Sequence, residues 1–468
     1  MQGGCYMKHV IKVIFLALAV LLLGSGLTWS AGQQDMAAKE KVDLEWWIIP
    51  WRIRIPGFPA DQAPDGTEFI EWASNTFMEK YPYATVKGVM VSNKEFEQKT
   101  MAAIAAGTNP NVQWGRREVV QYAKAGLLVP LDEYLTREDR KDFVPKALEY
   151  FTYEGELWAF PWAFGNNGMG ITNLIYPPMF EEAGVDWKKI VEKGWTMDEF
   201  VAVGKKISHD TDGDGENDIF LTGFQGKNPS HLHTDWPWIH NFGGRLLNEA
   251  EDKIIIDSPE TIAGFQFLVD AIYKHKIAPK GAEAADNYGV IKPFHAHKLA
   301  MGNGGPYEIG RIDRYVQRGD IEKFRPYVAP YPGVPGKQRG TYLVSQGMYV
   351  YKNQKNEATL EAAVEFAKHM TGKEVMPLIE TVLYISARNS VNQEIYRTDA
   401  WLEFKPDIDR YAAELSTYGY LFHGSPLFEY SKIRPFVGSL FQAVYGRSKI
   451  PEKAVKDFVK EANAALGW

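Results

Sequence analysis

An acidic loop, DTDGDGEND at residues 210–218, has the residue spacing that most clearly indicates a specific chemical function, cation binding. Three of its aspartates fall at positions 1, 3 and 5 of a calcium-binding loop, and a fourth falls at position 9. The candidate metal ligands are Asp210, Asp212, Asp214, Glu216 and Asp218. Position 12 is Leu221, so the bidentate glutamate of an EF-hand is missing. Two interpretations stay open: a structural Ca²⁺ site, or a metal-free Asx turn between a helix and a strand.

Two histidine pairs have a spacing that could place both imidazoles on one face of a strand: His231 with His233, and His295 with His297. Neither pair has a third ligand at a spacing typical of zinc, so hydrogen-bonding loop histidines are the default interpretation. The sequence contains no G-x-S-x-G, H-E-x-x-H or P-loop motif. It therefore predicts no required cofactor and no catalysis of these classes.

Aromatic side chains gather in the stretch 152–184. A short aromatic strand, 157–160, is predicted to end at Pro161, because proline lacks the N–H that a central strand donates. A glycine- and asparagine-rich passage at 165–170 follows, and then a second extended run at 169–176. The pattern predicts two ordered regions joined by a pliable crossing segment. Aromatic faces beside such a joint are typical of a ligand cleft between two lobes.

The elements on both sides of this segment alternate between strands and helices. Before it, the sequence predicts strands at 42–49, 84–91 and 111–114, and helices at 67–80, 93–106 and 118–125. After it, Thr196 and Glu199 form a capping box, and Ser258 and Pro259 open a second helix. Further helices are predicted at 359–370 and from Pro451 onward. This alternation is typical of an α/β fold with a parallel sheet covered on both sides.

Length and charge narrow the class of protein. A chain of 468 residues with 45% hydrophobic and 24% charged residues is expected to form more than one globular domain. Residues 1–31 contain two Lys and no acidic residue, so the remainder holds 50 basic residues against 59 acidic ones. This balance argues against nucleic acid or an anionic membrane as the main partner.

The first 31 residues predict a secretory signal peptide. Lys8 and Lys12 precede an apolar run at 13–23, which is too short to span a bilayer, and small residues follow it as far as Ala31. The one cysteine, Cys5, precedes this run, so there is no lipobox cysteine after it. We therefore expect a periplasmic or secreted, free and monomeric protein without disulfides.

Several sequence blocks resemble the family 1 extracellular solute-binding proteins, the secreted sugar-binding components of ABC importers and a family that includes maltose-binding protein. The blocks are AAGTNPNV at 105–112, KAGLLVPL at 124–131, YEGELWAFP at 153–161, WTMDEF at 195–200, the acidic loop, and GGPY at 304–307. They occur in family order and cover essentially the whole mature chain from about residue 42. Tyr307 stands where Trp is usual, Ser345-Gln346-Gly347 stands where a Gly-Gly pair is common, and the loop at 50–66 is longer than typical.

The resemblance implies an α/β, two-lobe periplasmic-binding-protein-like fold of type II, with the ligand between lobes joined by crossing strands. On this mapping the first lobe covers 42–162 and 331–375, and the second covers 165–328 and 376–468. It implies a protein without catalysis that captures a saccharide, by default a neutral oligosaccharide. The protein would close by hinge bending and deliver the saccharide to an ABC-type membrane permease.

Sugars present flat C–H faces and hydroxyl groups, which aromatic and polar side chains bind. The aromatic candidates are Trp51, Trp114, Trp162, Trp236, Trp238 and Tyr307. The polar candidates are Arg52, Arg116, Glu118, Asn166, Glu308, Arg311 and Arg388. Core burial is the alternative for each tryptophan, and a solvated surface or a salt bridge is the alternative for the arginines. Arginines in a cleft would also suit an acidic sugar or a sugar phosphate through bidentate pairing.

Two other functions remain open at this point. A secreted carbohydrate-active enzyme would share the export signal and the abundance of Trp, and a glycosidase needs only two carboxylates across a cleft. A chemosensory or adhesion component would differ only in its partner.

Overall fold

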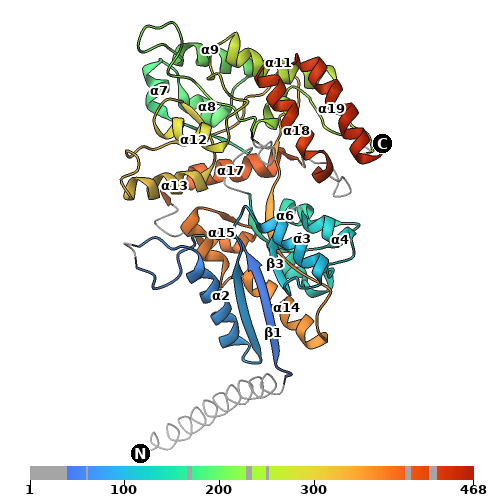
Figure 1. Ribbon diagram of the computed structural model, residues 1–468. Helices are drawn as coiled ribbons and strands as arrows, with labels where there is room; N and C mark the ends of the chain where they lie inside the picture. Colours follow the sequence, from blue (N-terminus) through green and yellow to red (C-terminus); the bar gives the residue numbers. More distant parts are fainter. Residues whose placement is uncertain are drawn as a thin grey trace, which may run out of the picture. The chain divides into compact units, whose positions relative to one another are not determined.

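The computed structural model of the chain describes residues 39–59, 62–116, 118–165, 171–227, 234–248, 252–395, 402–420 and 430–468. The predicted signal peptide, Asn166 and the pair His231 and His233 lie outside the described residues. The chain forms two compact units, which are considered separately (Figure 1). In the described ranges, no helix has both the length and the apolar character needed to cross a membrane.

The first unit comprises Met1–Trp51, Ile55–Gln113 and Val350–His369. Its elements are β1 (Val42–Ile48), α2 (Thr67–Lys80), β2 (Ala84–Met90), α3 (Phe96–Ala106), the start of β3 (Val112–Gly115) and most of α14 (Glu357–Met370). Strand β1 pairs in parallel with both β2 and β3. The predicted strand and helix alternation is therefore confirmed in this unit, and α2 has the bounds that the sequence predicted.

The core of the first unit forms because β1 and α2 each bury one face. In β1 alternate residues are buried, and in α2 the apolar stripe that includes Phe69 and Phe77 is buried. Trp46 of β1 lies 5.2 Å from Phe366 of α14, measured between ring centroids, and its indole N–H donates to Ser74 Oγ at 3.0 Å. Burial of each large apolar side chain of this kind contributes roughly 1.5–3 kcal/mol.

The second unit comprises Arg52–Arg54, Trp114–Tyr349 and Met370–Trp468. Its helices are α4 (Glu118–Lys124), η1 (Asp132–Tyr134), α5 (Arg137–Asp142), α6 (Pro145–Phe151), α7 (Pro177–Glu182), α8 (Trp187–Lys193), α9 (Met197–Ile207), α10 (Trp236–Asn241), α11 (Pro259–Tyr273), α12 (Asn287–His295), α13 (Pro306–Gln317), η3 (Met376–Val382), α15 (Asn389–Ile395), α17 (Lys405–Tyr418), α18 (Tyr430–Tyr445) and α19 (Pro451–Leu466). Its strands are β4 (Thr152–Tyr153), β5 (Glu156–Leu157), β6 (Phe160–Phe164), β7 (Asn173–Ile175), β8 (Met301–Asn303), β9 (Tyr327–Ala329), β10 (Thr341–Tyr342), β11 (Ser345–Val350), β12 (Ile385–Ser386) and β13 (Gly419–Tyr420).

The strands of the second unit pair mainly in antiparallel fashion. Strand β7 lies between β8 and β9, and β6 lies between β11 and β12. Helices α11, α18 and α19 pack against one another (Figure 1). The predicted capping box of α9 is present, because Thr196 Oγ1 accepts the Glu199 N–H at 3.1 Å and Glu199 Oε2 accepts the Thr196 N–H at 2.8 Å.

The prediction that a strand ends at Pro161 is wrong. Strand β6 runs through Pro161 from Phe160 to Phe164. The register of β11 against β6 shifts between Gln346 and Gly347, and Gly347 is the residue opposite Pro161. Strand β12 pairs only with the last part of β6, so it requires no donor from Pro161. A bulge beside a short neighbouring strand therefore accommodates a residue without an N–H.

Candidate functional site

Helix α13 positions Tyr307, which the GGPY block predicts to lie near a ligand. Pro306 occupies the first turn, where its missing N–H has no cost. At the preceding Gly304 a Cβ would lie 2.9 Å from Leu174 Cδ1 and 3.0 Å from Glu308 Cβ. Glycine is therefore needed for the chain to enter the helix so close to β7. Tyr307 follows in the first turn and is half-buried.

The Tyr307 ring meets the ring of Tyr384. Their centroids are 5.3 Å apart with an interplanar angle of 65°, which is the edge-to-face arrangement that aromatic pairs prefer. Tyr384 follows Leu383, whose φ of 52° lies in the left-handed region that non-glycine residues rarely adopt. Leu383 Cδ1 would lie 3.1 Å from a Cβ at Gly310, so glycine in α13 leaves room for this turn. The strained turn and the glycine together fix Tyr384 beside Tyr307.

A glutamine completes the polar side of this ring pair. The Gln346 side chain hydrogen-bonds to the Tyr384 hydroxyl, and its Nε2 donates to the Gly165 carbonyl at 3.3 Å. Its Oε1 is buried and has no hydrogen-bond partner among the described residues. Burial raises the pKa of Tyr384 well above its ordinary value, Tyr307 acts in the same direction and Arg116 opposes them. The hydroxyl therefore stays neutral and can both donate and accept.

Arg116 lies directly after β3 and acts electrostatically on Tyr384. Its guanidinium carbon is 5.0 Å from the centroid of the Trp114 ring, within the range of a cation–π interaction. Its Nε is buried without a partner in the described part of the chain. The backbone N–H of Arg116 donates to Glu118 Oε1 at 2.9 Å, which places the half-buried Glu118 at the start of α4.

Arg314 lies two turns after Tyr307 on the same stripe of α13. Its guanidinium carbon is 5.6 Å from the centroid of the Tyr307 ring. Burial lowers the pKa of Arg314, Tyr307 and Glu308 oppose this shift, and the cations Arg311 and Arg52 reinforce it. We call Arg116, Tyr307, Arg314, Gln346 and Tyr384 the Tyr307 cluster. It offers an aromatic face, a neutral hydroxyl, an amide oxygen and two cations within one unit.

Glu308 and Arg311 lie on the neighbouring stripe of α13. Glu308 Oε1 is 3.1 Å from His295 Nε2, and Glu308 Oε2 is 3.3 Å from Arg311 Nη1. Glu308 is only 3% exposed. A cavity of about 600 Å³ lies beside these residues, lined by α12 and α13 with Tyr288 and Tyr315 among its residues. These contacts join α13 to α12, so the structure does not place Glu308 and Arg311 in the Tyr307 cluster.

The predicted tryptophans of the second unit are all buried. Their exposed fractions are 2% for Trp114, 0% for Trp162, 1% for Trp236 and 1% for Trp238. The Trp238 ring lies 4.8 Å from that of Phe200 and 5.3 Å from that of Tyr331, measured between centroids. Such packing is typical of a core. Of these four, Trp114 adjoins the Tyr307 cluster through Arg116, and a stacking role for the other three stays a prediction.

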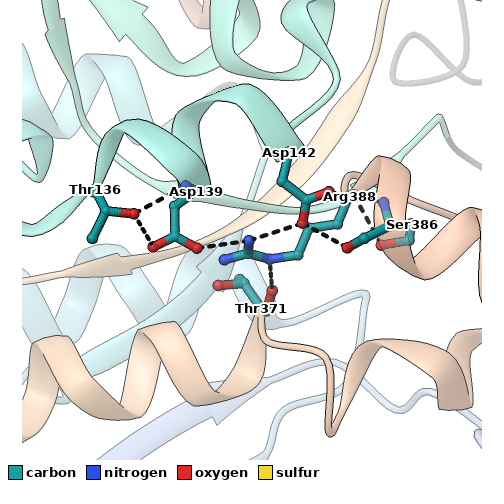
Figure 2. A network of polar contacts seen from close by, with 7 residues as sticks. Thr136, Asp139, Asp142, Thr371, Ser386 and Arg388 are labelled. Atoms are coloured by element: carbon teal, nitrogen blue, oxygen red, sulfur yellow. Dashed lines mark hydrogen bonds and ion pairs between the residues drawn. The ribbon is translucent and has the colours of Figure 1, made fainter.

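Arg388 is held by protein groups, as Figure 2 shows. Its Nη1 lies 2.9 Å from Asp139 Oδ1 and 3.3 Å from Asp142 Oδ2, and its Nε donates to the Thr371 carbonyl at 2.6 Å. Its guanidinium carbon is 4.2 Å from the centroid of the Phe143 ring. These contacts tie α5 to the segment between β12 and α15. They give Arg388 a structural role, and its role toward a ligand stays a prediction.

The remaining candidates are spread over both units. Arg52 is exposed and belongs to the second unit, where it acts on Arg314. Trp51 belongs to the first unit and is 7% exposed. Asn166 lies outside the described residues.

The acidic loop brings together three of its five candidate ligands. One carboxylate oxygen each from Asp210, Asp212 and Asp218 lie within 4.8 Å of one another. Asp210 also accepts backbone N–H groups from Gly213 at 2.6 Å and Gly215 at 2.7 Å, and these bonds lower its pKa. In contrast, Asp214 Oδ1 accepts the backbone N–H of Glu216 at 2.8 Å, and the Glu216 carboxylate forms an ion pair with Lys280. The oxygen donors fit a hard cation, with fewer protein ligands than a full calcium loop supplies.

The described histidine pair is used in packing. His295 contacts Glu308, and the His297 ring stacks on Tyr176 with centroids 4.2 Å apart. In the described ranges the acidic loop is the one group of three or more residues that could hold a metal ion.

Three members of the Tyr307 cluster, Arg314, Gln346 and Tyr384, are not among the ligand candidates that the sequence predicts. Arg314 could have been found, because it lies seven residues after Tyr307 and therefore shares its helical stripe. In the sequence, Gln346 is marked only by its departure from the family pattern. Tyr384 reaches Tyr307 through tertiary packing, and no local motif marks it.

The comparisons with known proteins show which family and which fold the chain shares. A family model described as bacterial extracellular solute-binding protein matches residues 60–377. A maltotriose-binding protein of Pyrococcus abyssi (strain GE5 / Orsay) is 27% identical over 254 residues, which are 54% of this chain and 49% of that protein. The match thus spans about half the length of this relative.

Two solved structures show the same fold. An ABC substrate-binding protein of Listeria monocytogenes in complex with cycloalternan has a TM-score of 0.71 at 21% identity, covering 92% of this chain and 100% of that one. The maltose/maltodextrin-binding domain MalE of Bdellovibrio bacteriovorus bound to maltotriose has a TM-score of 0.67 at 22% identity, covering 91% and 100%. The α/β, two-lobe type II fold predicted from the sequence is confirmed. The chain belongs to the family of bacterial extracellular solute-binding proteins.

Proposed function

We propose that this protein binds a saccharide outside the cytoplasm and delivers it to an ABC-type membrane permease. Membership of the solute-binding family supports capture of a solute. The two similar structures named above hold oligosaccharides, which supports a saccharide as the solute here.

The single observation that carries the proposal is the composition of the Tyr307 cluster. A half-buried tyrosine ring at a helix start can stack on the C–H face of a sugar ring. Beside it, the Tyr384 hydroxyl and the unpartnered Gln346 Oε1 can bond sugar hydroxyl groups. An apolar face flanked by a few fixed polar groups is typical of a small-ligand site.

The first experiment is a titration calorimetry screen of the mature chain against neutral and acidic oligosaccharides. We expect Tyr307→Ala to weaken binding of the best ligand at least about tenfold, because the stacking face is lost. Tyr288→Ala is the matched control, since Tyr288 is 54% exposed and lines the cavity between α12 and α13. If Tyr288→Ala weakens binding and Tyr307→Ala does not, the ligand site is that cavity and the assignment to the Tyr307 cluster is wrong.

The protein is proposed to bind without catalysis. A glycosidase would need two carboxylates flanking the ligand. Near the cluster, Glu308 is engaged by His295 and Arg311, and Glu118 accepts a backbone N–H. Mass spectrometry of the bound oligosaccharide after prolonged incubation should return the intact compound, and hydrolysis products would establish an enzyme instead.

Export by the predicted signal peptide at residues 1–31, a monomeric state and a permease partner complete the proposal. The family supports an extracellular location and a permease partner, and the residue pattern at 1–31 supports the signal peptide. A structural Ca²⁺ in the acidic loop is a further part of it, supported by the convergence of Asp210, Asp212 and Asp218.

A further inference from the structure

Two arginines of the Tyr307 cluster have no carboxylate partner. Neither Arg116 nor Arg314 forms an ion pair with any residue that the structure describes, and both side chains are half-buried. Three other arginines of the same unit each hold an acid: Arg311 holds Glu308 at 3.3 Å, Arg339 holds Glu414 at 2.7 Å, and Arg388 holds Asp139 at 2.9 Å. Arg116 and Arg314 therefore differ from these three arginines in having no acidic partner among the described residues.

The surroundings compensate this positive charge only in part. Arg52 adds a third cation near Arg314. Glu308 and Asp313 both act electrostatically on Arg314, but neither forms an ion pair with it, and the two oxygens of Glu308 contact His295 and Arg311. Moving a charge out of water is unfavourable unless it is paired. Two half-buried guanidinium groups without an ion pair to a described acid therefore lower the stability of the ligand-free protein.

A ligand that supplies the missing negative charge would reverse this cost. We propose that the captured saccharide is anionic, with acidic groups bound by Arg314 beside the Tyr307 ring and by Arg116, while Tyr307 stacks on the sugar ring. This inference rests on the proposed saccharide-binding function and adds the chemical class of the ligand. The planar guanidinium forms paired hydrogen bonds with a carboxylate, a sulfate ester or a phosphate ester.

The neutral groups of the cluster fit the rest of such a ligand. Gln346 Oε1 is a buried acceptor without a partner in the described part of the chain, and it suits a sugar hydroxyl. The Tyr384 hydroxyl is neutral and hydrogen-bonded to Gln346, so it can serve a second hydroxyl. A neutral saccharide could use these groups but would leave both guanidinium groups unpaired.

The test compares ligands that differ only in charge. Calorimetry of the mature chain would use trigalacturonate, trimannuronate and an unsulfated chondroitin disaccharide, each beside its methyl ester, with maltotriose as a neutral reference. A sulfated disaccharide and a sugar phosphate would be titrated in the same way to test sulfate and phosphate esters as the acidic group. We expect one acidic ligand to bind at least about 30-fold more tightly than its uncharged counterpart, with affinity that falls as salt rises.

Two variants test the assigned residues. Arg116→Gln and Arg314→Gln should each weaken the acidic ligand at least about tenfold and leave maltotriose unchanged. Arg318→Gln is the matched control, because Arg318 is an exposed residue that pairs with Asp320 at the end of α13.

The outcomes separate this inference from the proposed function. Neutral and acidic ligands that bind equally well, with binding lost in Tyr307→Ala, would overturn the inference and leave saccharide capture intact. Acidic binding that survives both arginine substitutions would also overturn it. If no saccharide in the panel binds, both proposals fail.

Discussion

Two buried ionisable residues at α10, Asp235 and His240, change the pH dependence of stability in opposite directions. Asp235 is fully buried, and burial raises its pKa to about 7 although Tyr445 and the Gln225 N–H both donate to it. His240 lies five residues later and stacks on Tyr420 with ring centroids 3.6 Å apart. Burial lowers the pKa of His240 to about 3, and Arg245 acts in the same direction.

The signs of these two shifts follow from proton linkage. The folded protein keeps the Asp235 proton up to about pH 7, while the unfolded chain releases it near 3.8, so this residue lowers stability as pH rises between these values. The unfolded chain protonates His240 near 6.5, while the folded protein does so near 3, so this residue lowers stability as pH falls. Between about pH 4 and 6.5 the two slopes nearly cancel.

A substitution of either residue should therefore expose the pH dependence of the unfolding free energy that the other residue causes. Relative to the parent protein, Asp235→Asn should make the free energy of unfolding rise with pH, by about 1.4 kcal/mol per pH unit between pH 4.5 and 6.5. His240→Phe, which preserves the stack on Tyr420, should make it fall by a similar amount. Urea unfolding at several pH values measures both. Curves that run parallel to that of the parent would show that these groups ionise alike in the folded and unfolded states.

At the scale of elements, the ion network around Arg388 joins pieces of chain that are far apart in sequence. We expect Arg388→Ala to lower the free energy of unfolding by about 3–5 kcal/mol, because Asp139 and Asp142 lose their shared partner. Arg140→Ala is the matched control on α5, where an exposed pair with Asp132 contributes less than about 1 kcal/mol. Denaturant unfolding measures both effects.

The same network offers a way to test the ligand role that the sequence assigned to Arg388. Arg388→Lys keeps the charge and loses the fork that reaches Asp139 and the Thr371 carbonyl together. It should lower stability and leave saccharide affinity unchanged. Weaker binding at unchanged stability would instead restore Arg388 as a ligand contact.

The acidic loop gives a prediction for a second element. Ca²⁺ should raise the unfolding temperature of the chelator-treated protein, and at 100 times its dissociation constant it should add about 2.7 kcal/mol. Asp212→Asn should abolish this effect, because Asp212 belongs to the converging group. Asp214→Asn is the control, since Asp214 lies outside that group and, like Asp212, accepts one backbone N–H. An unchanged melting curve in Ca²⁺ would establish the loop as a metal-free turn.

For the whole molecule, local patterns predicted the elements well wherever local physics determines them. The helix at 67–80 has a complete apolar stripe, and the helix after Thr196 has a complete capping box, so both were located from the sequence. The predicted strand end at Pro161 is wrong because β6 accommodates this proline through a register shift in β11, which is nearly 190 residues away in the chain. A rule about one strand cannot anticipate the geometry of its neighbour.

The candidate site divides in the same way. The GGPY block located Tyr307, and the helical period could have added Arg314. Tyr384 and Gln346 arrive from other elements, so their place depends on the fold. The buried tryptophans show a further limit, because an indole suits a core and a sugar equally well and only the fold decides between them.

Helix α13 divides its duties between two adjoining stripes. Glu308 and Arg311 anchor it to α12, while Tyr307 and Arg314 belong to the proposed ligand site. Substitutions at two or three positions of the ligand stripe could therefore change the ligand that is bound, while the contacts of Glu308 and Arg311 with α12 stay the same. Related proteins could therefore differ in ligand specificity while they keep the same packing of α13 against α12.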